Sequence, residues 1–113
     1  MKGKRVRWLA DEVTVPPFSQ EAASEVGALI EVVALGGVPP MPHSRPIPSV
    51  GLRCHELRVR DRGIDWRIVY HITQEAIVVL DVFRKKTRTT PRAIIDRCMK
   101  RLRRYEREHQ DGA

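Results

Sequence analysis

The sequence predicts an α+β domain in which a mainly antiparallel sheet is combined with an early amphipathic helix and a late basic one. Apolar residues alternate with the two-residue period of strands in the segments 4–9, 52–60 and 64–72, and segment 76–84 is an almost continuous apolar run. They recur at helical spacing between Ser19 and Gly36 and again from Pro91 to Tyr105. Because 113 residues are too few for two cores, we expect a single domain over residues 1–113.

Local signals bound the early helix. It follows the helix-breaking pair Pro16-Pro17, and Ser19 is a suitable N-cap. The pair Gly36-Gly37 is expected to end it, because glycine tolerates the backbone conformation that terminates helices. The predicted buried face consists of Ala22, Val26, Leu29, Ile30 and Val33.

Residues 38–50 contain five of the eight prolines. Proline has no backbone N–H group and a fixed φ angle, so this segment can form neither a helix nor a central strand. We expect a surface loop between the early helix and the remaining strands.

The segments 52–60, 64–72 and 76–84 are separated by short turns and predict an antiparallel meander. Alternation places Trp66, Ile68 and Tyr70 on the core face of the middle strand, together with Leu57 from the strand before it. Glu56, Arg58 and Arg67 then point to the other, exposed face, where hairpin geometry brings the two arginines together. The third strand is almost continuously apolar, which is typical of a central strand covered on both faces.

The net charge of +7 is concentrated in the last part of the chain. Residues 1–50 contain 5 basic and 5 acidic residues, whereas residues 84–107 contain 11 basic residues and 2 acidic ones. Such a surplus opposes folding through self-repulsion, so it indicates a polyanionic partner, with a merely solubilising surface as the alternative. In the late helix Ile95, Cys98, Leu102 and Tyr105 share the apolar face.

Several classes of protein are disfavoured. Cys54 and Cys98 are the only cysteines, and they form neither a disulfide framework nor a zinc-binding spacing. No export or membrane-spanning segment is visible, so we expect a cytoplasmic protein without a membrane partner. We also expect no metal and no cofactor.

Three short elements carry a resemblance to a known family. They are Glu56-Leu57-Arg58, Trp66-Arg67-Ile68-Val69-Tyr70, and Phe83-Arg84-Lys85-Lys86-Thr87 followed by Thr90-Pro91. From about Trp8 to Tyr105 the chain resembles the RelE and ParE toxin superfamily, and within it the phage-derived HigB-like branch of type II toxin–antitoxin toxins. The resemblance implies a compact RelE-like domain whose curved sheet packs on the early helix. It also implies an endoribonuclease that cuts mRNA, generally on the ribosome, and a helix-turn-helix antitoxin partner.

Matching the motifs residue by residue gives the candidate site. Arg58, Arg67, Lys85 and Lys86 are expected to be catalytic, with the two arginines clamping the scissile phosphate. An ion pair from Arg58 to Glu56 is the structural alternative. Only one of the two lysines can reach the phosphate if the strand continues through both. Further RNA contacts are expected from Phe83, Arg84, Arg88, His71, Arg97, Arg101 and Arg104.

Some of these residues have plausible structural roles instead. Phe83 can stack on a nucleobase or belong to the core. His71 shares the predicted face of Arg67 and has a near-neutral ordinary pKa, but it can equally be a strand histidine without a task. Tyr70 and Tyr105 are expected in the core. The basic face from Arg97 to Arg107 suits ribosomal RNA or an acidic antitoxin segment.

Two other functions fit the same fold. One is a ParE-like inhibitor of DNA gyrase that cuts no RNA, and the other is a non-toxic phage remnant that binds nucleic acid. The Phe83-to-Lys86 element and Arg67 favour the ribonuclease over the gyrase inhibitor, because the inhibitor needs no phosphate clamp.

Overall fold

The computed structural model describes residues 3–9, 18–37 and 44–110. The elements in chain order are β1 (Arg5–Trp8), α1 (Gln20–Ala34), β2 (Ser44–Pro46), β3 (Cys54–Asp61), β4 (Ile64–Ile72), β5 (Ala76–Arg84) and α2 (Arg92–Gln110). The strands form one sheet in the order β1-β5-β4-β3-β2, in which only the β1–β5 pairing is parallel. The predicted α+β fold with a mainly antiparallel sheet is therefore confirmed.

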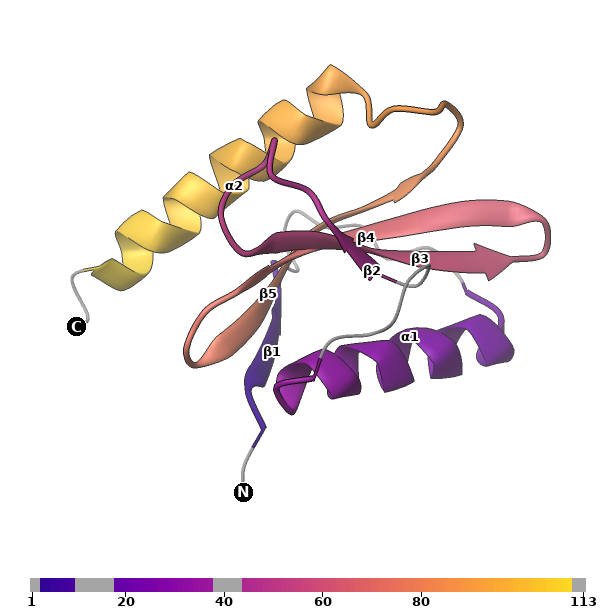
Figure 1. Cartoon of the computed structure of the whole chain (residues 1–113), viewed down its shortest axis with the longest axis horizontal. Coiled ribbons are helices and arrows are strands. Elements are labelled where there is room, and N and C mark those ends of the chain that lie inside the picture. Colours follow the sequence, from indigo (N-terminus) through magenta and orange to yellow (C-terminus); the bar gives the residue numbers. More distant parts are fainter. Residues whose placement is uncertain (1–2, 10–17, 38–43, 111–113) are drawn as a thin grey trace.

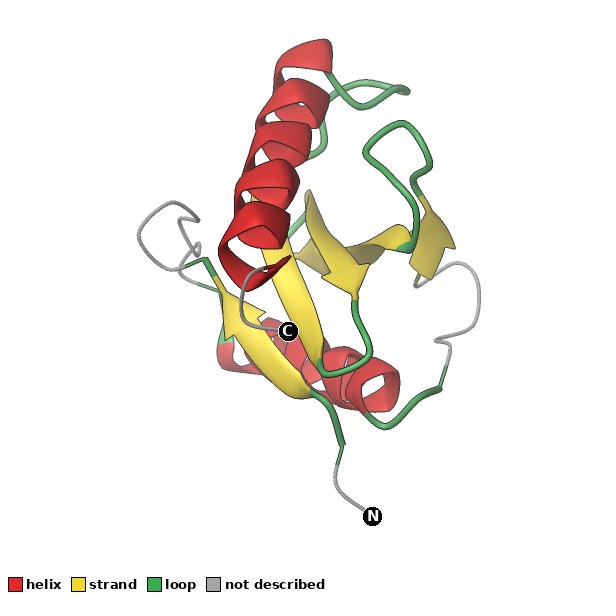
Figure 2. Cartoon of the chain, turned by 90° about the vertical axis from the view of Figure 1, so that its left-hand side faces the viewer, coloured by secondary structure: helices red, strands yellow, loops and turns green. Residues whose placement is uncertain are grey.

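The two helices lie on opposite faces of the sheet (Figures 1 and 2). The apolar face of α1 covers one face, where Val26 and Ile30 pack with Leu57, Ile68 and Val79. Ser19 caps this helix as predicted, because its side chain accepts a hydrogen bond from the backbone N–H of Ala22. Gly36, with φ +90°, follows the C-cap residue Leu35.

The second helix covers part of the other face. Cys98, Leu102 and Tyr105 of α2 are buried against Val78 and Leu80 of β5, as the helical spacing predicted. The register of β4 and β5 shifts by one residue, because Val69 pairs with Asp81 while Tyr70 pairs with Val79. The extra residue, Leu80, is a β-bulge. Both Leu80 and Asp81 consequently face α2.

The proline-rich segment was predicted to be a surface loop that forms neither a helix nor a central strand. Among its described residues no helix or central strand occurs, but the description as loop is wrong for three residues. Ser44–Pro46 forms the edge strand β2, which pairs antiparallel with β3. An edge strand tolerates proline because one of its sides makes no ladder hydrogen bonds. The buried Ser44 hydroxyl also lies 2.9 Å from the Tyr70 hydroxyl, within hydrogen-bond distance. Residues 38–43 of the predicted loop lie outside the described residues.

The start of β3 also differs from the prediction. Leu52 lies outside the strand with 88% of its surface exposed, because Arg53 adopts a left-handed conformation with φ +57°. At its other end β3 extends to Asp61, which pairs with Ile64. The predicted three-residue turn is therefore a two-residue hairpin connection of Arg62 and Gly63, both with positive φ.

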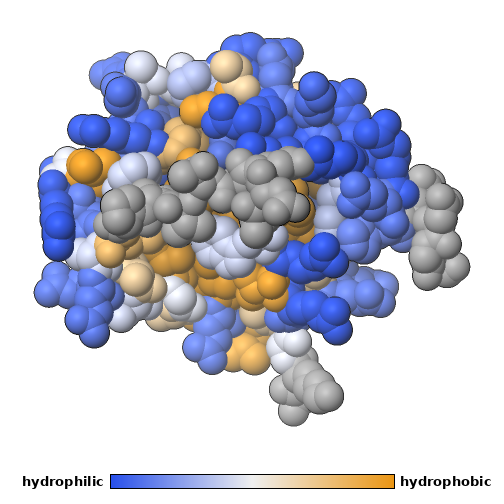
Figure 3. Space-filling view, turned by 180° about the vertical axis from the view of Figure 1, so that it is seen from behind, coloured by the Kyte–Doolittle hydropathy of each residue, from blue (hydrophilic) through white to orange (hydrophobic). Residues whose placement is uncertain are grey.

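Seen from behind, most of the surface is hydrophilic (Figure 3). Hydrophobic atoms gather in the lower half of this view, around β1 and the end of α1, where Val32 and Leu35 are exposed. Within the described parts of the chain, neither helix has the length and apolar character needed to cross a membrane.

Candidate active site

Arg58 and Arg67 are directly opposite each other on the antiparallel strands β3 and β4. Directly opposed residues on one sheet face have their Cβ atoms within about 5.5 Å of each other. The predicted proximity of the two arginines is therefore confirmed. The predicted exposure of their sheet face is wrong, because Arg67 keeps only 12% of its side chain accessible and the neighbouring Glu56 only 6%.

Glu56 lies between these two arginines. One of its carboxylate oxygens, Oε1, is 4.0 Å from Arg58 Nε and 3.9 Å from Arg67 Nε. These separations permit electrostatic attraction but exceed the range of a hydrogen bond. Among the described residues, Glu56 Oε2 and the Nε atoms of both arginines are buried without a hydrogen-bond partner. The ion pair considered as the alternative role of Arg58 thus exists, but only in this loose form.

Lys85 joins the arginines from the segment after β5. Its backbone N–H donates to the Asp65 carbonyl at 2.7 Å, so the chain remains in register with β4 beyond the last strand residue. Its ammonium group lies 3.3 Å from the Thr90 hydroxyl. Burial lowers the pKa of Lys85, and the nearby charges of Arg67, Arg58 and Arg45 lower it further, against an opposing effect of Glu56. A lysine in this state releases a proton more readily than an exposed one.

Arg45 of β2 completes the cluster, and the sequence reasoning missed it. It is paired with Glu56 across the β2–β3 ladder, and its charge acts on both Arg67 and Lys85. The signal available in the sequence was Ser-Arg-Pro within the proline-rich segment. If this short stretch forms an edge strand, its arginine lies beside a residue of the adjacent strand. Arg45, Glu56, Arg58, Arg67 and Lys85 are called the clamp cluster below.

Burial also lowers the pKa of Arg67, and Arg58 contributes in the same direction, while Glu56 and Asp65 oppose it. The cause is the desolvation of a guanidinium group beside a like charge. A bound anion would relieve both effects, because it supplies negative charge and hydrogen-bond acceptors to the unpartnered Nε atoms.

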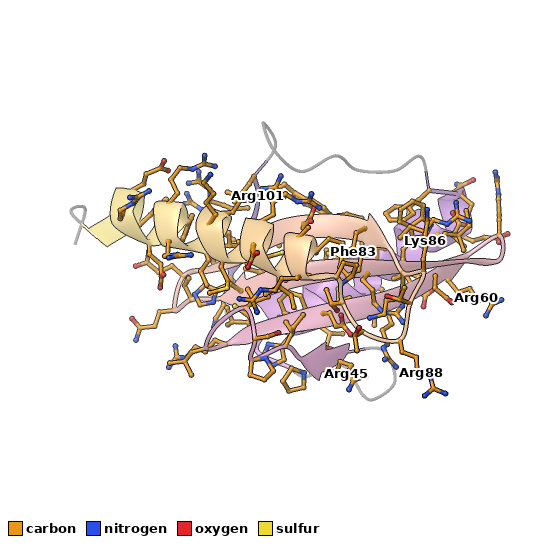
Figure 4. The ribbon with its side chains drawn as sticks, turned by 90° about the horizontal axis from the view of Figure 1, so that it is seen from above. Arg45, Arg60, Phe83, Lys86, Arg88 and Arg101 are labelled. Atoms are coloured by element: carbon orange, nitrogen blue, oxygen red, sulfur yellow. The ribbon has the colours of Figure 1, made fainter. Side chains whose placement is uncertain are left out.

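The neighbouring motif residues divide between core and surface. Phe83 is opposite Arg67 and only 6% exposed, within the cluster of apolar residues beneath α2, so its alternative role in the core is the one observed. Arg84 is paired with Trp66, which packs on the α1 side of the sheet. Lys86 and Arg88 are exposed. In Figure 4, Arg45 and Arg88 project from the same side of the molecule, and Lys86 lies apart from them.

A comparison with known protein families identifies the family of this chain. Residues 16–103 match the model of the family described as phage-derived protein Gp49-like (DUF891), which is 88 of the 113 residues. The chain belongs to the Gp49-like family. This family is associated with RelE-like toxins. A search of curated proteins found no match.

In this Gp49-like protein, two of the predicted RNA-binding arginines on α2 are engaged within the fold. Arg97 contacts Asp81 Oδ2 through Nη2 at 2.5 Å and through Nε at 3.0 Å. Arg101 lies 3.2 Å from Asp81 Oδ1 and donates to the Leu80 carbonyl at 2.7 Å. Asp81 is 4% exposed, so these contacts fasten α2 to β5 at the bulge. Arg104 is half-exposed and lies 3.9 Å from Glu108.

His71 shares the face of Arg67 but not its site. The two residues are four positions apart on β4, which corresponds to roughly 13 Å along a strand. The His71 ring nitrogen Nδ1 is 3.4 Å from Cys54 Sγ, and burial lowers the pKa of this histidine. Tyr105 is buried and stacks on His109, as its expected place in the core implies. Neither ring belongs to the clamp cluster.

Across the described residues, no three His, Cys, Asp or Glu side chains are grouped so that they could hold a metal ion. The clamp cluster itself brings together four cations and one carboxylate on one patch of the sheet. Such a patch can bind a phosphodiester, stabilise additional negative charge on it and exchange protons with it.

Proposed function

We propose that this Gp49-like protein is the toxin of a type II toxin–antitoxin system, in the HigB-like branch, and acts as a metal-independent mRNA endoribonuclease. RNA contains its own nucleophile, because the 2′-hydroxyl group can attack the adjacent phosphorus. The enzyme must then orient the phosphate, stabilise the charge that develops on it and move two protons. The clamp cluster contains groups suited to each of these tasks.

The observation that carries the proposal is the set of unpartnered, buried Nε atoms of Arg58 and Arg67 on directly opposed residues. An arginine fork binds two oxygens of one phosphate and stays charged throughout a reaction. Together with Arg45 and Lys85, these arginines supply four positive charges. Glu56 supplies one negative charge, so the clamp cluster has a net charge of +3. A phosphorane-like transition state, which carries more negative charge than the ground-state diester, gains most from this surplus.

The partners proposed are ribosome-bound mRNA and a helix-turn-helix antitoxin encoded beside the toxin. Arg88 is exposed on the side of the molecule from which Arg45 projects and can contact flanking RNA. The exposed Lys86 and Arg84 can contact RNA further from the clamp cluster. On α2, Lys100, Arg103 and Arg107 are exposed as well, and they supply positive charge for ribosomal RNA or for an acidic segment of the antitoxin. The site of action is the cytoplasm, where translation occurs.

The test is to express the chain in bacteria without an antitoxin and to map the 5′ ends of cellular mRNA during growth arrest. New ends inside translated regions are expected, and Arg67→Ala should abolish them while the purified variant remains folded. Arg5→Ala, which removes an exposed arginine from β1 at the far side of the sheet, is the matched control and should remain toxic. Arrest with intact mRNA and broken chromosomal DNA would replace the proposal with gyrase inhibition. Normal growth would indicate a non-toxic remnant.

A further inference from the structure

The same sheet face contains two buried carboxylates with very different surroundings. Asp81 is engaged on both oxygens, by Arg97 and Arg101, and it also accepts the backbone N–H of Val82 at 2.9 Å. Glu56 is equally buried, at 5% exposure, but makes no hydrogen bond through Oε2, and its arginine contacts through Oε1 are no shorter than 3.9 Å. Asp81 is therefore a structural carboxylate, whereas Glu56 leaves its oxygen Oε2 without a hydrogen-bond partner among the described residues.

A buried carboxylate without partners is costly unless neighbouring charges compensate for its lost hydration. The charges that face Glu56 come from every strand around it: Arg45 from β2, Arg58 from β3 and Arg67 from β4, with Lys85 following β5. These cations hold the carboxylate in the site electrostatically. They do not occupy the oxygen Oε2 with a hydrogen bond, so its capacity to accept one is unused within the described part of the folded chain.

Lys85 has the complementary property. Burial and three arginines lower its pKa, so its ammonium form is a stronger acid than that of an ordinary lysine. Its Nζ is held near the Thr90 hydroxyl, at the margin of the clamp cluster. Lys86, next along the chain, is exposed.

We propose that Glu56 is the proton acceptor and Lys85 the proton donor of the RNA cleavage reaction. This inference rests on the proposed ribonuclease function. Glu56 Oε2 takes the proton of the 2′-hydroxyl as the 2′-oxygen forms a bond to phosphorus. The bond from phosphorus to the 5′-oxygen breaks, and its electron pair stays on that oxygen, which receives a proton from Lys85. The products are a 2′,3′-cyclic phosphate and a free 5′-hydroxyl group, and exchange with water restores both side chains.

A sulfur leaving group separates the two roles. The experiment compares an oligonucleotide that has a single ribonucleotide at the mapped cleavage site with the same molecule in which sulfur replaces the bridging 5′-oxygen. A thiolate is a far weaker base than an alkoxide and leaves without protonation. Lys85→Met should therefore lower the single-turnover rate by about 100-fold or more with oxygen and restore most of it with sulfur. Glu56→Gln should lower both rates to the same extent, because the 2′-hydroxyl must still lose its proton.

The controls distinguish chemistry from binding and folding. Lys86→Met should weaken RNA binding but leave the ratio of the sulfur and oxygen rates at its wild-type value. If Glu56→Gln does not fold, Glu56→Ala is assayed with added formate, which should restore part of the rate as an external base. An equal loss by Lys85→Met on both substrates, or a loss of less than threefold by Glu56→Gln, would overturn the assignment. Failure of the wild type to cut either substrate, both free and bound to ribosomes, would instead overturn the proposed function.

Discussion

Replacement of Asp81 by asparagine tests whether the α2 arginines are structural. The substitution keeps the size of the side chain but removes the negative charge that Arg97 and Arg101 share. Breaking a buried ion pair from one side costs about 3–5 kcal/mol, because the remaining charge is left without compensation. Arg101 is 12% exposed and fits this case, whereas the 46% exposure of the Arg97 side chain allows water to replace its partner. We therefore expect the free energy of unfolding to fall by about 3 kcal/mol, the lower end of this range.

This loss is large for a protein of 113 residues, whose free energy of unfolding is about 6–17 kcal/mol at ordinary values per residue. With a urea m-value of roughly 1.5 kcal/mol/M, the unfolding midpoint should fall by about 2 M. Amide exchange should increase first in α2, since Asp81 fastens this helix to β5. Asp96→Asn is the matched control: its ion pair with Arg92 is exposed and is worth only about 0.5 kcal/mol. Equal midpoints for the two variants would refute the reasoning.

Three further predictions concern single residues. Arg45→Gln should raise the pKa of Lys85, measured by NMR titration, because it removes a positive charge that disfavours the protonated amine. If Lys85 donates the proton, the loss of activity at high pH should move to higher pH in the same variant. Burial raises the pKa of Cys54 and of Cys98 to about 12, so neither thiol should react with a disulfide reagent at pH 8 until the protein is unfolded. Arg62→Asn should raise the melting temperature by about 2–4 °C, because asparagine tolerates the left-handed conformation at φ +51° better than arginine does.

Most of the fold can be predicted from local patterns in the sequence. The alternation in β4, the continuous apolar run of β5 and the helical spacing in α2 predict which side chains are buried. In β4 and α2 one face is against the core, whereas β5 is covered on both faces. The edge strand β2 escapes this reasoning. Only three residues long, it has no periodicity of its own and forms because β3 offers it a free edge.

The sequence predicts the central pair of the candidate site, Arg58 and Arg67, but not the role of the arginines on α2. Parity on two adjacent strands places Arg58 and Arg67 on one face of the sheet. Their direct opposition depends on the two-residue turn, which the predicted strand bounds did not contain. Arg97 and Arg101 were assigned to RNA because the sequence shows their charge but not their partner. Their partner, Asp81, lies in an apolar strand 16 residues before Arg97, and no local pattern indicates which helix will cover it.

The bulge at Leu80 explains why the sequence alone left open which lysine joins the arginines. With uninterrupted alternation, Ala76, Val78 and Leu80 would share their face with Arg84 and Lys86. The extra residue reverses the parity, so that Asp81, Phe83 and Lys85 face the α2 side instead. One irregularity therefore places Asp81 beneath α2 and Lys85 beside Arg67. The attachment of the helix and the composition of the clamp cluster consequently depend on the same local backbone feature.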